Sequence, residues 1–291
     1  MYCTIQAINL NNNQEIFIES YIKNNGILCT KFDDHQPQGE YQKNKGFGQL
    51  GQSINSSSLS EREIDLEGTI LGENRLQVET LKKQLISVFN PLDNVLIKYT
   101  NEYTIKEIIV KSESVPVFSE ELNIDIALAF TVTLDAPYPL WQDQEETIVN
   151  VETWESKFEF PFCLESTGVE IGIKGPNEIE FINEGEMKAP LEFYFKAPAL
   201  NPKIMLNNKE FIQVNRQLND GDTLYIKTMY GDTRVEIIKS TGERENAYGY
   251  IDPFSTFFSL PVGSNIISYS TEGDFIPQSV IVKYKNQYLS L

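Results

Sequence analysis

Paired carboxylates come closest to a catalytic pattern in this chain, because two suitably placed carboxyl groups can cleave a glycosidic bond. Such pairs occur at Glu120 and Glu121, at Glu145 and Glu146, and at Asp220 and Asp222. The chain contains 42 acidic residues, so close pairs also arise by chance. The sequence NDGD around the last pair is typical of a turn before a strand, and it lacks the further oxygen ligands of a calcium site. We therefore expect neither a glycosidase nor a calcium site.

Histidine, the commonest general base, occurs once, as His35. It lies beside two aspartates in a polar segment, which favours an exposed loop histidine over a catalytic one. The sequence GFGQLG at 46–51 is rich in glycine, as phosphate-binding loops are, but it lacks the flanking strand and helix that such a loop needs. The three cysteines, Cys3, Cys29 and Cys163, are too widely spaced for a zinc site or a disulfide framework, so we expect free thiols. The sequence predicts no catalytic residue, no cofactor and no metal site.

The charge of the chain argues against binding to polyanions. The formal net charge is −18, and both halves are acidic: residues 1–140 contain 11 basic and 19 acidic residues, and residues 141–291 contain 13 and 23. Nucleic acids and anionic membranes require clustered lysine and arginine, so we expect no specific nucleic-acid partner and no membrane partner. The N-terminal sequence shows no signal peptide, and no run of about 18 apolar residues predicts a membrane-spanning helix.

Apolar alternation predicts strands through most of the first half. The segments EIFIESYI, GILCTKF and EREIDLEGTIL have this pattern, and in the third Ile64, Leu66, Gly68 and Ile70 share one face. NVLIKYT and YTIKEIIVKSESVPVF follow, and LNIDIALAFTVTL reads as one long strand from Ile124 to Leu134.

One helix is predicted in the segment NRLQVETLKKQLISVFNP. The apolar stripe that defines it is Leu76, Leu81, Leu85 and Val88 or Phe89. Asn74 and Gln77 form a plausible N-cap pair, and Pro91 ends the helix. The stripe predicts that this helix lies on a sheet.

Residues 33–60 differ from their surroundings because Gln, Asn, Gly and Ser dominate. This composition predicts a long polar loop or arm. Ordering it costs roughly 1–2 kcal/mol per residue in backbone entropy, and a neighbouring subunit could offset that cost. The hypothesis is that the segment becomes ordered across a subunit boundary, with Tyr41, Phe47 and Leu50 as its apolar anchors.

The second half contains no helical period. Short apolar runs alternate with Gly, Pro and Asn turns from about Asp143 onward, which predicts a β-sandwich. The segment YIDPFSTFFSLPVGSNIISYST at 250–271 carries no strong general base. In it, Gly263 and Asn265 suit a tight turn, and Phe257, Phe258 and Leu260 suit a strand anchored in the core.

Three motifs occur in a fixed order in this half. They match at Gly185, Glu186, Ala189 and Pro190, then at Gly221, Asp222, Leu224 and Ile226, and then at Asp252, Phe257, Phe258, Leu260, Gly263, Asn265 and Ile267. The strand-then-helix element at 61–91 and the closing segment FTVTLDAPYPLW extend the pattern over nearly the whole chain. In type and order it resembles the distal tail proteins of phages of Gram-positive bacteria.

The resemblance implies a mainly β protein. A ring-forming belt domain, a β-barrel-like sheet with one helix, would span residues 1–142 and include the polar loop 33–60; a galectin-like β-sandwich would span residues 143–291. Such proteins form a homo-oligomeric hexameric ring between the tail tube and the tip. The expected partners are the tail tube protein, the tape measure protein and a tail tip, hub or tail-associated lysin protein, with a receptor-binding protein as a further candidate. The place of work would be the distal end of a virion tail or a tail-like particle, assembled in the host cytoplasm.

A carbohydrate-binding module that acts in host attachment is the alternative function, because galectin-like sandwiches are similar to lectins. Sugar sites usually stack an aromatic ring on the sugar. The two tryptophans, Trp141 and Trp154, both lie near the expected domain junction instead of on a sandwich face. The residues that carry the resemblance are turn and core residues, so it implies a structural protein without enzymatic activity.

Overall fold

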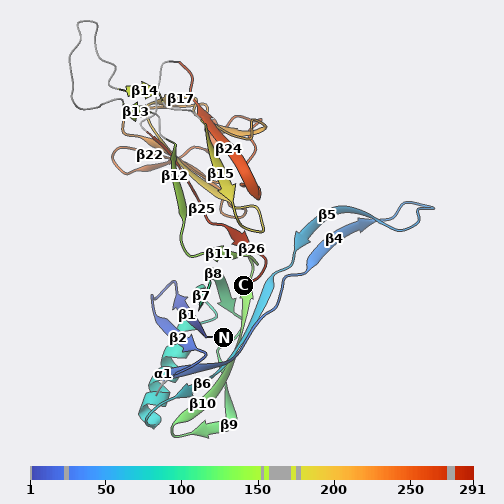
Figure 1. Cartoon of the computed structure of the whole chain (residues 1–291), viewed down its shortest axis with the longest axis vertical. Helices are drawn as coiled ribbons and strands as arrows, with labels where there is room; N and C mark the ends of the chain where they lie inside the picture. Colours follow the sequence, from blue (N-terminus) through green and yellow to red (C-terminus); the bar gives the residue numbers. More distant parts are fainter. Residues whose placement is uncertain (1, 23–25, 152–153, 157–171, 175–177, 274–278) are drawn as a thin grey trace. The chain divides into compact units, whose positions relative to one another are not determined.

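The computed structural model describes residues 2–22, 26–151, 154–156, 172–174, 178–273 and 279–291. The chain forms two compact units (Figure 1). The first contains the residues up to Gln144 together with Tyr288–Leu291, and the second contains Glu145–Gln287. The chain therefore enters the second unit after Gln144 and returns to the first for its last four residues, a return that no sequence pattern indicates.

The first unit contains one helix and most of the long strands. Its elements are β1 (Cys3–Asn9), β2 (Glu15–Glu19), β3 (Gly26–Asp34), β4 (Gly39–Asn44), β5 (Ser53–Leu59), β6 (Arg62–Leu71), α1 (Arg75–Val88), β7 (Val95–Asn101), β8 (Ile105–Ser112), β9 (Val117–Ile124), β10 (Ala127–Ala136) and β11 (Trp141–Asp143), with β26 (Gln287–Tyr288) added at the C-terminus.

Seven of these strands close into a barrel. The ten-stranded sheet has the order β26-β11-β8-β7-β1-β2-β3-β6-β10-β9, and an additional pairing of β8 with β10 joins its ends into a ring of β8, β7, β1, β2, β3, β6 and β10. The pairs around the ring are antiparallel except β2 with β3, which is parallel and has a single registered pair, Glu19 with Leu28. The predicted barrel-like sheet is confirmed.

Strand β6 shows why the sequence forms this barrel. Ile64, Leu66 and Ile70 are buried and alternate with more exposed acidic residues, as the predicted half-buried strand requires. Gly68 lies on the same inner face, where an added Cβ would meet the ring of Phe130 at 2.7 Å and the carbonyl oxygen of Leu28 at 2.8 Å. A larger residue at this position would force the two neighbouring strands apart.

Helix α1 packs on β1, β2 and β6. Asn74 is the N-cap, and its side chain accepts a hydrogen bond from the backbone N–H of Gln77, as predicted. The buried face is Val78, Leu85, Val88 and the following Phe89, whereas the predicted stripe residue Leu76 is exposed. At the other end, the buried Asn9 of β1 donates to the carbonyl oxygens of Ser87 and Val88. Among the described residues, no helix is long and apolar enough to span a membrane.

One prediction for this unit is wrong, and another is decided in favour of one of its two alternatives. The run from Ile124 to Leu134 is a hairpin, because the chain turns at Asp125 and Ile126 between β9 and β10. Ile124 and Ile126 are exposed, so apolar alternation there does not mark a buried face. Of the two alternatives predicted for residues 33–60, a long polar loop or an arm, the loop is wrong: β3 extends to Asp34, and β4 and β5 pair in an antiparallel hairpin that forms an arm.

The second unit is built from short strands. They are β12 (Thr147–Val151), β13 (Trp154–Ser156), β14 (Gly172–Lys174), β15 (Glu178–Asn183), β16 (Leu191–Lys196), β17 (Ala199–Leu200), β18 (Lys203–Leu206), β19 (Glu210–Gln213), β20 (Gln217–Leu218), β21 (Thr223–Lys227), β22 (Arg234–Ile238), β23 (Arg244–Asn246), β24 (Gly263–Ser270) and β25 (Ser279–Tyr284), with a 3₁₀ turn at Tyr248–Tyr250.

Two antiparallel sheets enclose the core of this unit. One has the order β12-β25-β16-β21-β22-β23, and the other has the order β15-β24-β18-β19. Side chains from both meet in one buried cluster, in which Phe195 of the first sheet contacts Tyr269 of the second edge to face at 5.8 Å between ring centroids. Phe193 contacts Phe258 in the same way at 5.9 Å. The predicted β-sandwich is confirmed.

The prediction for the segment before β24 is wrong in two details. Residues 252–259 form no strand, although Phe258 and Leu260 are buried as expected. Gly263 has φ of 89° and makes the expected turn at the start of β24. Asn265 is no turn residue: its buried amide donates to the carbonyl oxygens of Pro261 and Gly263, and its oxygen accepts from Asn207. The asparagine holds the irregular segment in place by hydrogen bonds.

Candidate functional site

The most exposed element of the first unit is the hairpin arm, which we define as residues 36–60. It contains β4 and β5, and it extends away from the barrel strands β3 and β6 that lead into it (Figure 1). Every residue of β4 and all but one residue of β5 are exposed. An isolated two-stranded hairpin is at best marginally stable in water, because it has no apolar face to bury. The arm therefore lacks the packing that stabilises the rest of the unit.

Apolar side chains lie along this arm without cover. Phe47 and Leu50, at the tip, are as exposed as in an extended chain, and Tyr41 and Ile54 are more than half exposed. The glycines of the tip make its turn, with positive φ at Gly48 and Gly51, so the sequence GFGQLG is a hairpin end and no phosphate-binding loop.

The arm also differs from the rest of the chain in charge. It contains two lysines and one glutamate, a net charge of +1, whereas the remaining residues contain 22 basic and 41 acidic side chains, a net charge of −19. An acidic surface of another copy of this chain would attract the arm.

A buried arginine fixes the root of the arm. Arg62, fully buried at the start of β6, forms an ion pair with Asp34 at the end of β3 and donates to the carbonyl oxygens of Pro139 and Leu289. Trp141 donates to the other oxygen of Asp34 at 3.1 Å. Sequence reasoning missed Arg62. It lies two residues before Ile64, on the same buried face of β6, and this spacing was a signal that its side chain is buried.

His35 lies just beyond Asp34, next to charged residues of β6. Its Nε2 is 3.3 Å from a carboxylate oxygen of Asp65, and its Nδ1 is 3.9 Å from a carboxylate oxygen of Asp33. The hydrogen bond to Asp65 raises the pKa of His35, and the same bond lowers the pKa of Asp65. The prediction of an exposed histidine is correct, but the residue lies within an ionic cluster.

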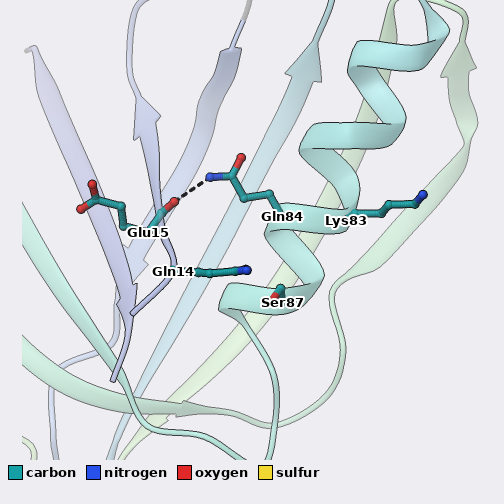
Figure 2. Close-up of a pocket in the computed structure, with 5 residues that line it drawn as sticks. All are labelled: Gln14, Glu15, Lys83, Gln84 and Ser87. Atoms are coloured by element: carbon teal, nitrogen blue, oxygen red, sulfur yellow. Dashed lines mark hydrogen bonds between the residues drawn. The ribbon is translucent and has the colours of Figure 1, made fainter. Parts of the chain in front are cut away.

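An open pocket of about 610 Å³ lies between α1 and the start of β2 (Figure 2). Its lining consists of Gln14, Glu15, Lys83, Gln84 and Ser87. Gln84 donates from Nε2 to the backbone oxygen of Glu15 at 2.7 Å, and Figure 2 shows Lys83 pointing away from that contact. The hydrogen bond connects the helix to the strand, and these five residues present no nucleophile paired with a base.

Three of the remaining candidate residues have structural surroundings. Asp222 is buried and accepts from the backbone N–H groups of Asn219 and Ser240, as the turn interpretation of NDGD requires. Glu146 forms an ion pair with Lys283. Trp141 is buried in the core and cannot stack on a sugar. The side chains of Glu120, Glu121 and Trp154, and Cys163 as a whole, lie outside the described residues.

Two protein families match the chain, one for each unit. A family described as "Phage tail protein RIFT-related domain" matches residues 19–136, and one described as "Siphovirus-type tail component, C-terminal domain" matches residues 184–288. The two matches are collinear and cover both the barrel and the sandwich. The chain belongs to the siphovirus distal tail protein family. Members of this family are structural components of phage tails, which agrees with the resemblance seen in the sequence.

Solved structures share the fold over the whole chain. The SPP1 Dit protein, described as a paradigm of the hub adsorption apparatus in phages that infect Gram-positive bacteria, has 13% sequence identity and a TM-score of 0.62, over 97% of this chain and 98% of that one. The phage P2 baseplate in its activated conformation with calcium gives 13% identity and a TM-score of 0.54, over 100% and 99% of the chains. The corresponding strontium structure gives 0.55 with the same identity and coverage. A search of curated proteins found no match.

Proposed function

We propose that six copies of this chain form a ring at the distal end of the tail and that the ring joins the tail tube to the tip complex. The first unit, expected at residues 1–142, is the ring-forming belt, and the sandwich is carried outside it. The proposal is supported by the family, by the shared fold with the SPP1 hub protein and a P2 baseplate protein, and by the hairpin arm.

The single observation that carries the ring is the uncovered arm. A hairpin with exposed Phe47 and Leu50 at its tip gains stability only if another surface buries it. The arm has a net charge of +1 and the remainder −19, so a second acidic copy is a suitable acceptor. An arm that reaches from each copy to the next makes a heterologous contact, and such contacts close into a ring when the rotation between copies permits it.

The proposed partners follow from this position. The tail tube protein and the tape measure protein lie on one side of the ring, and a tip, hub or tail-associated lysin protein lies on the other; a receptor-binding protein is a further candidate. The protein acts in a virion tail or a tail-like particle that is assembled in the host cytoplasm. The role is structural and requires no catalysis or cofactor.

Removal of the arm tests the ring directly. Residues 37–58 are replaced by a short Gly-Ser turn, and the mass in solution and negative-stain images are compared with those of the wild-type chain, alone and with the tube and tip proteins. We expect hexamers from the wild type and a folded monomer from the deletion. A wild-type chain that stays monomeric even with its tail partners contradicts the ring, and a deletion variant that assembles normally contradicts the role of the arm.

A carbohydrate-binding role is the second candidate from the sequence. Trp141 is buried in the barrel core, so its ring has no exposed face on which a sugar could stack. A glycan array with the full chain separates the two functions, because reproducible binding of one sugar class favours host attachment.

A further inference from the structure

Ionisable side chains face one another where β3 and β6 leave the barrel for the arm. Asp33 is directly opposite Asp65 in the strand register. The backbone N–H of His35 donates to the carbonyl oxygen of Glu63 at 3.2 Å, which continues the same register by one more pair. Side chains two residues apart on a strand point to the same face, so these four project together. Like charges placed directly opposite each other destabilise a sheet, and a bound cation would relieve that repulsion.

Lysine neutralises only part of this charge. Lys31 lies 3.5 Å from Asp33, 3.7 Å from Glu67 and 3.9 Å from Asp65. With Glu63 added, four carboxylates face one ammonium group, which leaves a net charge of −3 while His35 is neutral. The ammonium group of Lys31 pairs with Asp33, Asp65 and Glu67 but not with Glu63, so the end of the cluster where Glu63 faces the imidazole keeps excess negative charge.

We propose that His35, Glu63 and Asp65 bind a divalent transition-metal ion such as Zn²⁺. One ligand atom from each residue lies within 4.8 Å of the other two. Ligand atoms around a tetrahedral zinc ion, with bonds of about 2.1 Å, lie about 3.4 Å apart. Nε2 of His35 and the carboxylate oxygen of Asp65 are already 3.3 Å apart. His35 and Glu63 are exposed side chains, so rotations of their outer bonds bring the three atoms together without moving the backbone. Water completes the coordination on the solvent side.

Asp33 is the outer partner that such a histidine requires. When Nε2 of His35 binds the metal beside Asp65, Nδ1 faces the carboxylate of Asp33, now 3.9 Å away. A carboxylate on the second ring nitrogen orients the imidazole and raises its basicity, and losing such a partner costs about 10- to 100-fold in metal affinity. Asp33 is therefore a positioning residue.

The ligand set also determines which ion fits. Imidazole suits zinc, nickel, copper and cobalt, whereas calcium binds oxygen ligands and gains nothing from a histidine nitrogen. A bound ion would connect the last residue pair of β3 and β6 before the arm begins. Its predicted effect is to hold the root of the arm, and this effect does not depend on whether the arm contacts a second copy.

Calorimetric titration of the untagged full chain with Zn²⁺ tests the site. Cys3 and Cys29 are replaced by serine and Cys163 is alkylated or replaced in every protein, so that thiols do not bind the metal. We expect one ion per chain, at least tenfold weaker binding in His35→Ala, and about tenfold weaker binding in Asp33→Asn. Glu67→Gln is the matched control, because it removes a carboxylate of the same strand face without removing a ligand; its affinity should match that of the parent chain.

Three results would overturn the proposal. The first is absence of Zn²⁺ uptake by the parent chain. The second is equal binding of Zn²⁺ by His35→Ala and the parent chain, and the third is binding of Ca²⁺ as tight as that of Zn²⁺; either of these would indicate a diffuse attraction to acidic residues. Circular dichroism of each variant verifies the fold, and hydrogen exchange at 36–60 should slow upon addition of Zn²⁺ in the parent chain and in Glu67→Gln but not in His35→Ala.

Discussion

The tip of the hairpin arm offers the sharpest test of assembly, through the double substitution Phe47→Ser and Leu50→Ser. Both side chains are fully exposed in the single chain and contact no core. Surface substitutions of this kind change the free energy of unfolding by no more than about 0.5 kcal/mol. The monomer should therefore fold and melt as the wild type does.

The effect on assembly should be large by comparison. Full burial of a Phe or Leu side chain stabilises a contact by about 1.5–3 kcal/mol, and ordering each side chain costs about 0.5–1.5 kcal/mol. Two anchors thus leave a net contribution of about 3 kcal/mol per contact. Since about 1.4 kcal/mol corresponds to a factor of ten, each contact between copies should weaken roughly a hundredfold.

Sedimentation and native mass measurements over a concentration series detect this shift, with the tube and tip proteins present if the chain alone is monomeric. Tyr230→Ser is the matched control, since Tyr230 is almost fully exposed on the turn between β21 and β22, outside the arm. Assembly of the double variant at wild-type concentrations would refute the reasoning. Equal weakening of assembly by Tyr230→Ser would also refute it, because the effect would then come from exposed apolar side chains in general.

Three further predictions concern individual side chains. Arg62→Met leaves Asp34 without its ion-pair partner and should lower the free energy of unfolding of the first unit by about 3 kcal/mol, measured by denaturant titration. An unchanged denaturation midpoint would show that the ion pair does not stabilise this unit. Asn265→Ala removes the hydrogen bonds that hold the segment before β24, so we expect a loss of about 1–3 kcal/mol in the second unit, with wild-type melting as the contrary result. Burial raises the pKa of Cys29 to about 11 from a usual 9.0, so at pH 8 its thiolate is about a hundredfold scarcer and its alkylation in the native chain correspondingly slower than after unfolding. The same pKa shift makes the stability of the fold depend on pH. Because the native state disfavours the thiolate, the stabilising contribution of Cys29 is complete below pH 9 and is lost as the pH rises through about 11. Melting of the wild type and of Cys29→Ser as a function of pH measures this contribution.

Local patterns identified most inward positions where one face of an element is buried, although Leu76 of the predicted α1 stripe is exposed. Alternation in β6 identified Ile64, Leu66 and Ile70 as inward residues, and Asn74 marked the start of α1, because burial and capping depend on neighbours within a few positions. The same logic failed at the arm, where neither face is buried and no alternation is needed, so two hydrogen-bonded strands read as a loop. It also joined β9 to β10, because exposed Ile124 and Ile126 continue a pattern that normally marks a core.

The sequence by itself determined the fold class and the resemblance to distal tail proteins, since these depend on composition, periodicity and the order of turn motifs. Only the tertiary structure decided which distant residues meet. Closure of the barrel by β8 and β10, the contact of Arg62 with Asp34 and Leu289, and the approach of His35 to Asp65 all join residues far apart in the chain. Strand register sets these contacts, and register depends on the packing of the whole barrel, so no local window of sequence contains it.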